Sequence, residues 1–141
     1  MPGWMLPAAD DRERGSLSPM VAIVALASLI MIGLAYDGGQ KAQATQRAIA
    51  IADEAARAGG QAVNPEGVIG EAPPGVDVAA AVAAAESYLN AAGVDGDISI
   101  AAGGRQLVVT TTIQIQTVFL SLIGIDSMTV VGTGEADLVG S

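Results

Sequence analysis

The chain has 141 residues, no cysteine and no histidine, and its 15 acidic and 6 basic side chains give a net charge of −9. The missing cysteines exclude disulfides, and the missing histidines remove the usual general base and the commonest zinc ligand. An acidic chain without a basic stripe is unsuited to nucleic acid, because phosphate contacts need Lys and Arg. We therefore expect a non-catalytic protein that needs no cofactor or metal and binds no nucleic acid.

Residues 17–36 predict a transmembrane helix. They read LSPMVAIVALASLIMIGLAY, an uncharged run that as a helix extends about 30 Å, the thickness of the hydrocarbon layer of a bilayer. Ser18 followed by Pro19 is typical of a helix start, so we expect the helix to begin at Pro19. The main alternative is a secretory signal cut at Ala42-Gln43-Ala44, but the apolar run is longer than the roughly 7–15 residues of a signal core.

The chain on either side of this span predicts its orientation. Basic residues do not decide it, because two precede the span and two follow it closely. The short N-terminal stub and the long acidic remainder favour a cytoplasmic N-terminus. We therefore predict four parts: a cytoplasmic stub at 1–16, a single transmembrane helix at 17–36, a helical extension at 37–61 and an extracytoplasmic domain at 62–141.

The helical extension carries a stripe of small residues. Gly38-Gly39 either kinks the helix at the membrane surface or is tolerated at a cost of about 1 kcal/mol per glycine. Small residues spaced by four allow close approach of another backbone, within the chain or from a second one. The simpler interpretation is that alanine is common in this chain and suits any helix. The predicted helix-packing residues are Ala44, Ala48, Ala52, Ala56 and Gly60.

The remaining residues predict a small α+β domain. A Gly- and Pro-rich stretch at 64–76 indicates a loop, and Asp77 is placed to cap a second helix that Gly93 ends after Ala92. The pattern then changes to the alternation of strands. The expected fold is a three-stranded antiparallel sheet with the helices packed on one face, built from strands at 97–101, 106–116 and 127–138.

Between the last two strands lies the most apolar stretch outside the predicted span. Residues 117–125 read TVFLSLIGI, which is too short to cross a bilayer. One interpretation is that the stretch fills the gap between sheet and helix. The other is that it forms an exposed apolar patch for a partner or the membrane surface.

Three short segments, taken in order, resemble a known family. Arg14-Gly15-Ser16 precedes the apolar helix, Asp37-Gly38-Gly39 follows it, and the Ala-rich run 55–59 comes next. Together they resemble the TadE/TadG-like proteins of tight-adherence (Flp-type) pilus systems, especially the short actinobacterial kind, and the resemblance is best over residues 12–61. It implies a pilin-like minor pilin or pseudopilin, anchored by one helix, whose partners are membrane lipid, other Tad-system subunits and copies of itself.

The resemblance also indicates a candidate processing site. Cleaved members are cut after a glycine and carry a glutamate five residues later, which makes Gly15 and Ser16 the candidate cleavage residues. The fifth residue after Gly15 is Met20, so the glutamate is absent and an uncleaved, membrane-retained component fits better. The competing function is a membrane-tethered extracytoplasmic binding module unrelated to pili.

Overall fold

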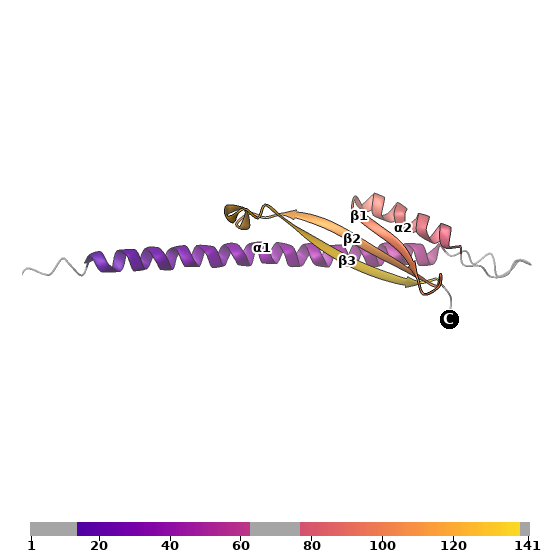
Figure 1. Cartoon of the computed structure of the whole chain (residues 1–141), viewed down its shortest axis with the longest axis horizontal. Coiled ribbons are helices and arrows are strands. Elements are labelled where there is room, and N and C mark those ends of the chain that lie inside the picture. The colour runs from indigo at the N-terminus through magenta and orange to yellow at the C-terminus, as the bar shows by residue number, and fades with distance from the viewer. Residues whose placement is uncertain (1–13, 63–76, 139–141) are drawn as a thin grey trace, which may run out of the picture.

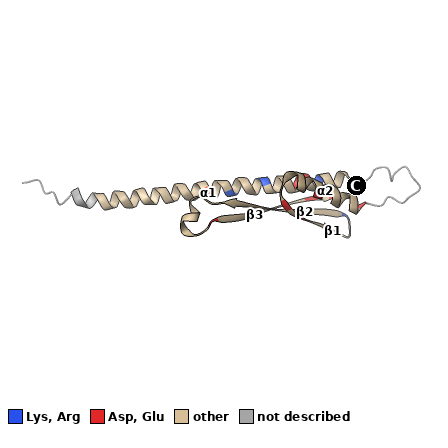
Figure 2. Cartoon of the chain, turned by 90° about the horizontal axis from the view of Figure 1, so that it is seen from above, with Lys and Arg blue, Asp and Glu red and all other residues tan. Residues whose placement is uncertain are grey.

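The computed structural model describes residues 14–62 and 77–138. Along the chain come α1 (Arg14–Gln61), α2 (Val78–Ala92), β1 (Asp95–Ala101), β2 (Gln106–Gln116), the short 3-10 helix η2 (Leu120–Ile123) and β3 (Ser127–Asp137). The strands form one antiparallel sheet in the order β1-β2-β3. Figures 1 and 2 show both helices on the same side of this sheet. The predicted α+β class and sheet are confirmed; the predicted loop at 64–76 and most of the stub lie outside the described residues.

The long helix α1 runs without interruption through Gly38 and Gly39. Its 48 residues correspond to about 72 Å of helix. The expected start at Pro19 is wrong, because α1 begins at Arg14 and Pro19 lies inside it. Pro19 lies in the second turn, where it removes only the hydrogen bond to the Gly15 carbonyl, so the helix tolerates it at this end.

The two halves of α1 have different surroundings. Apolar side chains between Met20 and Leu34 are 56–72% exposed, and Figure 1 shows this half of α1 projecting beyond the sheet. The half after residue 40 lies along β3 and β2. In Figure 2 the charged residues lie mainly on that second half and on the sheet and α2.

Two glycines allow α1 to approach β3 at backbone contact. A Cβ at Gly132 would overlap backbone atoms of Ala48, and one at Gly134 would overlap backbone atoms of Ala52. Residues four apart in a helix advance about 6 Å, and residues two apart in a strand advance about 6.8 Å. Because these advances are similar, the Ala48–Gly132 and Ala52–Gly134 contacts can both form. The Thr111 hydroxyl of β2 donates a 2.7 Å hydrogen bond to the Ala48 carbonyl at the same contact.

The core lies where α1, α2 and β2 meet. Leu107 and Val109 of β2 are fully buried there beneath small residues of both helices. Because the alanine side chain is a single methyl group, the backbones of α1, α2 and β2 lie close together, and few large side chains fill the core. The buried helix residues of this cluster are Ala52, Ala55, Ala56, Ala81, Ala85 and Leu89.

The second helix has the predicted ends. The Asp77 side chain accepts a hydrogen bond of 3.0 Å from the Ala80 N–H, and Gly93 adopts the left-handed conformation with φ of +65°. Strand β1 begins two residues earlier than expected because Asp95 and Gly96 still pair with β2. The last strand ends one residue early, and the Leu138 N–H donates to the Arg105 carbonyl.

Candidate functional site

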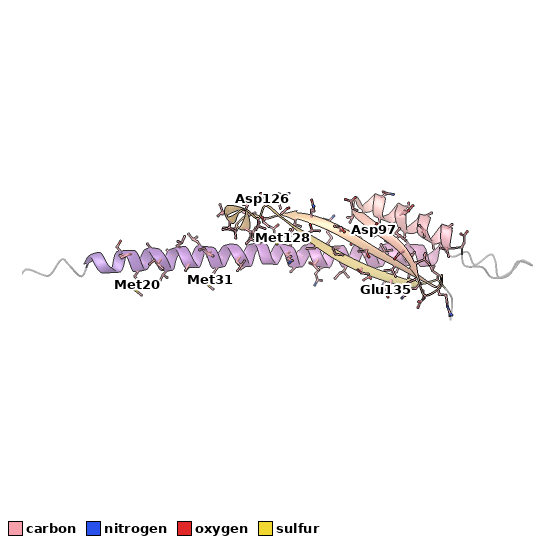
Figure 3. All side chains as sticks on the ribbon, in the orientation of Figure 1. Met20, Met31, Asp97, Asp126, Met128 and Glu135 are labelled. Carbon is pink, nitrogen blue, oxygen red and sulfur yellow. The ribbon has the colours of Figure 1, made fainter. Side chains whose placement is uncertain are left out.

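The end of the β2–β3 hairpin lies against the middle of α1. Figure 1 shows η2 at this end, over α1 and far from α2. In Figure 3 Asp126 and Met128 mark the same end, whereas Met20 and Met31 point away from the opposite side of α1. We call residues 117–125 the hairpin tip.

Asp37 fixes the hairpin tip to α1. One of its carboxylate oxygens accepts a hydrogen bond from the Val118 N–H at 3.0 Å. The other accepts from the N–H groups of Phe119 at 3.0 Å and Leu120 at 2.7 Å. Leu120 is the first residue of η2, where backbone N–H groups have no partner within the helix, and Val118 and Phe119 directly precede it. We call Asp37 with its three donors the Asp37 clasp.

The clasp is buried, with Asp37 only 1% exposed. Burial by itself raises the pKa of the Asp37 carboxyl, but the hydrogen bonds from Val118, Leu120 and Phe119 favour the charged form, and the net result is a pKa below the ordinary 3.8. A carboxylate held by three N–H groups is a charge-assisted contact that directs the hairpin tip to one place on α1.

An aromatic contact lies beside the clasp. Phe119 packs directly on Gly33, where a Cβ would come within 2.5 Å of the ring. The rings of Phe119 and Tyr36 meet edge to face with centroids 5.9 Å apart. Gly33, Tyr36 and Asp37 are spaced by three and four, so one face of α1 presents all of them to the hairpin tip.

An apolar groove separates the rest of the hairpin tip from α1. Its volume is about 470 Å³, and its walls carry aliphatic and aromatic side chains. One wall belongs to the predicted span and the other to the hairpin tip. The lining residues are Leu26, Leu29, Ile30 and Leu34 on α1, with Phe119, Leu120, Leu122 and Ile123 opposite.

Neither interpretation of residues 117–125 describes the structure fully. Phe119 does cover α1 at Gly33, but the segment does not lie between the sheet and α2. Leu122 and Ile123 are 83% and 73% exposed. The hairpin tip is therefore both a contact with α1 and an exposed apolar surface.

The predicted site residues lie at two other places. Ala44, Ala48, Ala52 and Ala56 are buried and Gly60 is half-buried on the α1 face that the chain's own sheet and α2 cover. A Cβ at Gly60 would contact Ala136 of β3. Gly15 and Ser16 belong to the first turn of α1, and their side chains lie outside the described part.

Sequence reasoning did not identify the clasp. The sequence around Asp37 gives no sign of its donors, because they lie 81 to 83 positions later in the chain. The available signal was an acid placed directly after twenty uncharged residues, together with an apolar stretch between two strands. Those two features belong to the same contact.

A family model described as putative Flp pilus-assembly TadE/G-like matches residues 15–62. Residues 15–62 are therefore similar to this family. The match spans almost the whole of α1, including the clasp aspartate and the alanine stripe, and leaves α2 and the sheet outside it. Searches of curated proteins and of solved structures find no match to the chain.

The TadE/G-like match confirms the resemblance seen in the sequence and implies a component related to Tad pilus assembly. Within the described residues, α1 is the one helix long and apolar enough to cross a membrane.

Proposed function

We propose that this chain is a non-catalytic structural or assembly component of a Tad/Flp-type pilus, similar to a minor pilin. Residues 17–36 span the cytoplasmic membrane, with residues 1–16 on the cytoplasmic side. The extension 37–61 and the domain 62–141 lie outside the cytoplasm. Its partners are membrane lipid and other pilin-like subunits.

The division of α1 into two halves carries this proposal. One face of the second half is buried by the chain's own sheet and α2, whereas large apolar side chains of the first half stand exposed. Each such side chain left in water lacks much of the roughly 1.5–3 kcal/mol that full burial contributes. Lipid, or the helices of neighbouring subunits, provides the burial that the chain itself does not.

The alanine stripe limits where subunits can meet. Ala48 and Ala52 are in contact with β3, so this face is not free for a second helix. The part of α1 that exposes large apolar side chains to neighbouring subunits is therefore residues 17–36, where a helix can pass from lipid to a helical bundle without exposing apolar surface to water.

Photo-crosslinking in pilus-producing cells tests this function. A photoreactive amino acid at Leu26, exposed in the first half of α1, should form adducts with other single-pass pilin-like chains. The same group at Ala48, buried against β3, should form none. Deletion of the gene should abolish or shorten the pili. Intact pili after deletion, together with strictly monomeric detergent-extracted protein, would contradict the proposal.

Processing has a separate test. Because Met20 stands where cleaved members have glutamate, we expect the mature protein to retain residues 1–15. Intact-mass measurement of protein from native membranes should give the full-length value. A mass lacking residues 1–15 would show that peptidase cleavage occurs and that the chain enters the filament pathway of cleaved pilins.

A further inference from the structure

The hairpin tip has the properties of a second membrane-contacting element. From Thr117 to Ile125 it carries no charged side chain, and Asp126 comes directly after it. Its exposed side chains are aliphatic apart from Phe119, which is 38% exposed. Besides Leu122 and Ile123, Val118 is 52% and Ile125 44% exposed. Such a patch at the end of a hairpin is unfavourable in water and favourable in lipid.

The position of the hairpin tip along α1 indicates what surrounds it. The clasp and the Phe119–Gly33 contact hold it at residues 33–37, where the uncharged run ends. The groove continues from Leu34 to Leu26, about 12 Å along the helix axis towards the N-terminus. Whatever surrounds the span at that depth also surrounds Leu122 and Ile123.

The backbone of the hairpin tip is also suited to a lipid environment. Unpaired backbone N–H groups are very costly in lipid because no water is present to bind them. Of the nine N–H groups from Thr117 to Ile125, three donate to Asp37. Four more, the N–H groups of Thr117, Leu122, Gly124 and Ile125, donate to backbone carbonyls. The two hydroxyls, of Ser121 and Thr117, donate to the carbonyls of Val118 and Ile125. Seven N–H groups and both hydroxyls are therefore satisfied without water.

We infer that the hairpin tip enters the leaflet on the side of the sheet domain, next to α1, and that a lipid acyl chain fills the groove between Leu26–Leu34 and Leu122–Ile123. The Asp37 clasp positions this element at the membrane boundary. The inference rests on the proposed function only in that α1 spans the bilayer. The domain is then attached to the membrane at two points, which fixes its tilt and rotation relative to the bilayer.

Spin-label depth measurements test the inference on the full chain in phosphatidylcholine nanodiscs. The chain has no cysteine, so single substitutions Leu122→Cys, Leu29→Cys and Val131→Cys each give one label. Leu29 is the standard for the span, and Val131, 53% exposed on β3, is the standard for water. The Leu122 label should be accessible to oxygen and protected from a water-soluble nickel complex, as the Leu29 label is.

The two standards separate the possible failures. A Leu122 label as accessible to nickel as the Val131 label, with Leu29 protected, overturns the inference and leaves the span intact. Access of the nickel complex to the Leu29 label would show that residues 17–36 do not span the bilayer, which overturns the proposed function. Dipolar broadening between Leu122 labels that disappears on dilution with unlabelled protein identifies a second copy of the chain as the occupant of the groove, and overturns the lipid assignment.

The clasp has its own test in the same system. Asp37→Ala should shift the Leu122 label several-fold towards nickel accessibility, because the three N–H groups lose their acceptor. Asp53→Ala, on the exposed side of the same helix, is the matched control and should leave the label unchanged. Equal depth in the two variants would overturn the positioning role of Asp37.

Discussion

Asp37 shows how one residue can connect distant parts of the chain. Its carboxylate, on α1, accepts from the first N–H group of η2 and from the two N–H groups that precede η2. Asp37→Asn retains the shape of the side chain but removes the charge and one acceptor oxygen. We expect the hairpin tip to detach from α1. Chymotrypsin should then cleave near Phe119 several-fold faster than in the unmodified protein. Asp53→Asn should cleave at the rate of the unmodified protein.

The clasp should weaken in acid. The pKa of folded Asp37 lies below the ordinary 3.8, so its ionised form stabilises the fold at every pH above that value. The contribution should decline as pH falls below 3.8 and disappear below the folded-state pKa. Hydrogen exchange at Val118 and Phe119 should therefore be unchanged between pH 5 and 7 after correction for the intrinsic rate, and should accelerate below pH 3.8. In the Asp37→Asn variant this acid-dependent step should be absent.

At the scale of elements, the packing of α1 on β3 depends on glycine. Gly134→Val places side-chain atoms where backbone atoms of Ala52 lie, and we expect a loss of about 1–3 kcal/mol or more in the free energy of unfolding. Gly38→Ala is the matched control, since no heavy atom lies within 4 Å of its added Cβ. That control should stabilise α1 by up to about 1 kcal/mol. Denaturant titration of the full chain in detergent measures both variants.

The cap of α2 gives a second prediction at this scale. Asp77→Ala removes the acceptor for the Ala80 N–H and should cost about 1 kcal/mol. Asp77→Ser should retain most of the stability, because serine also caps helices. Equal loss in both variants would mean that the Asp77 hydrogen bond does not stabilise α2.

The elements also show which parts of the structure the sequence could predict. The ends of α2 and β2 were predicted to the residue, because Asp77, Gly93 and the alternating pattern of β2 are local signals. Pro19 is a local signal that predicted the wrong start for α1. A proline near a helix end costs only one hydrogen bond, so the helix can begin before it. The partner of the alanine stripe was not predictable locally, because Gly132 and Gly134 lie more than 80 positions after the alanines they contact. The donors of Asp37 were not predictable for the same reason.

At the scale of the whole molecule, the two halves of α1 have separate roles. The first half of α1 presents apolar side chains to its surroundings, and the second half is the spine of a small domain. The clasp lies at the boundary between them, so the domain is fixed directly to the end of the proposed span. In a membrane or a helical bundle, a displacement of the span would therefore be transmitted to the sheet.

The central claim is that α1 crosses the cytoplasmic membrane once and carries the sheet domain outside. Labelling of single cysteines with a membrane-impermeant maleimide, in spheroplasts before and after permeabilisation, tests it most directly. Val131→Cys should react in intact spheroplasts, and Ala8→Cys should react only after permeabilisation, with both proteins in the membrane fraction. Protection of Val131→Cys in intact spheroplasts, or recovery of the full-length protein in the soluble fraction, would contradict the claim.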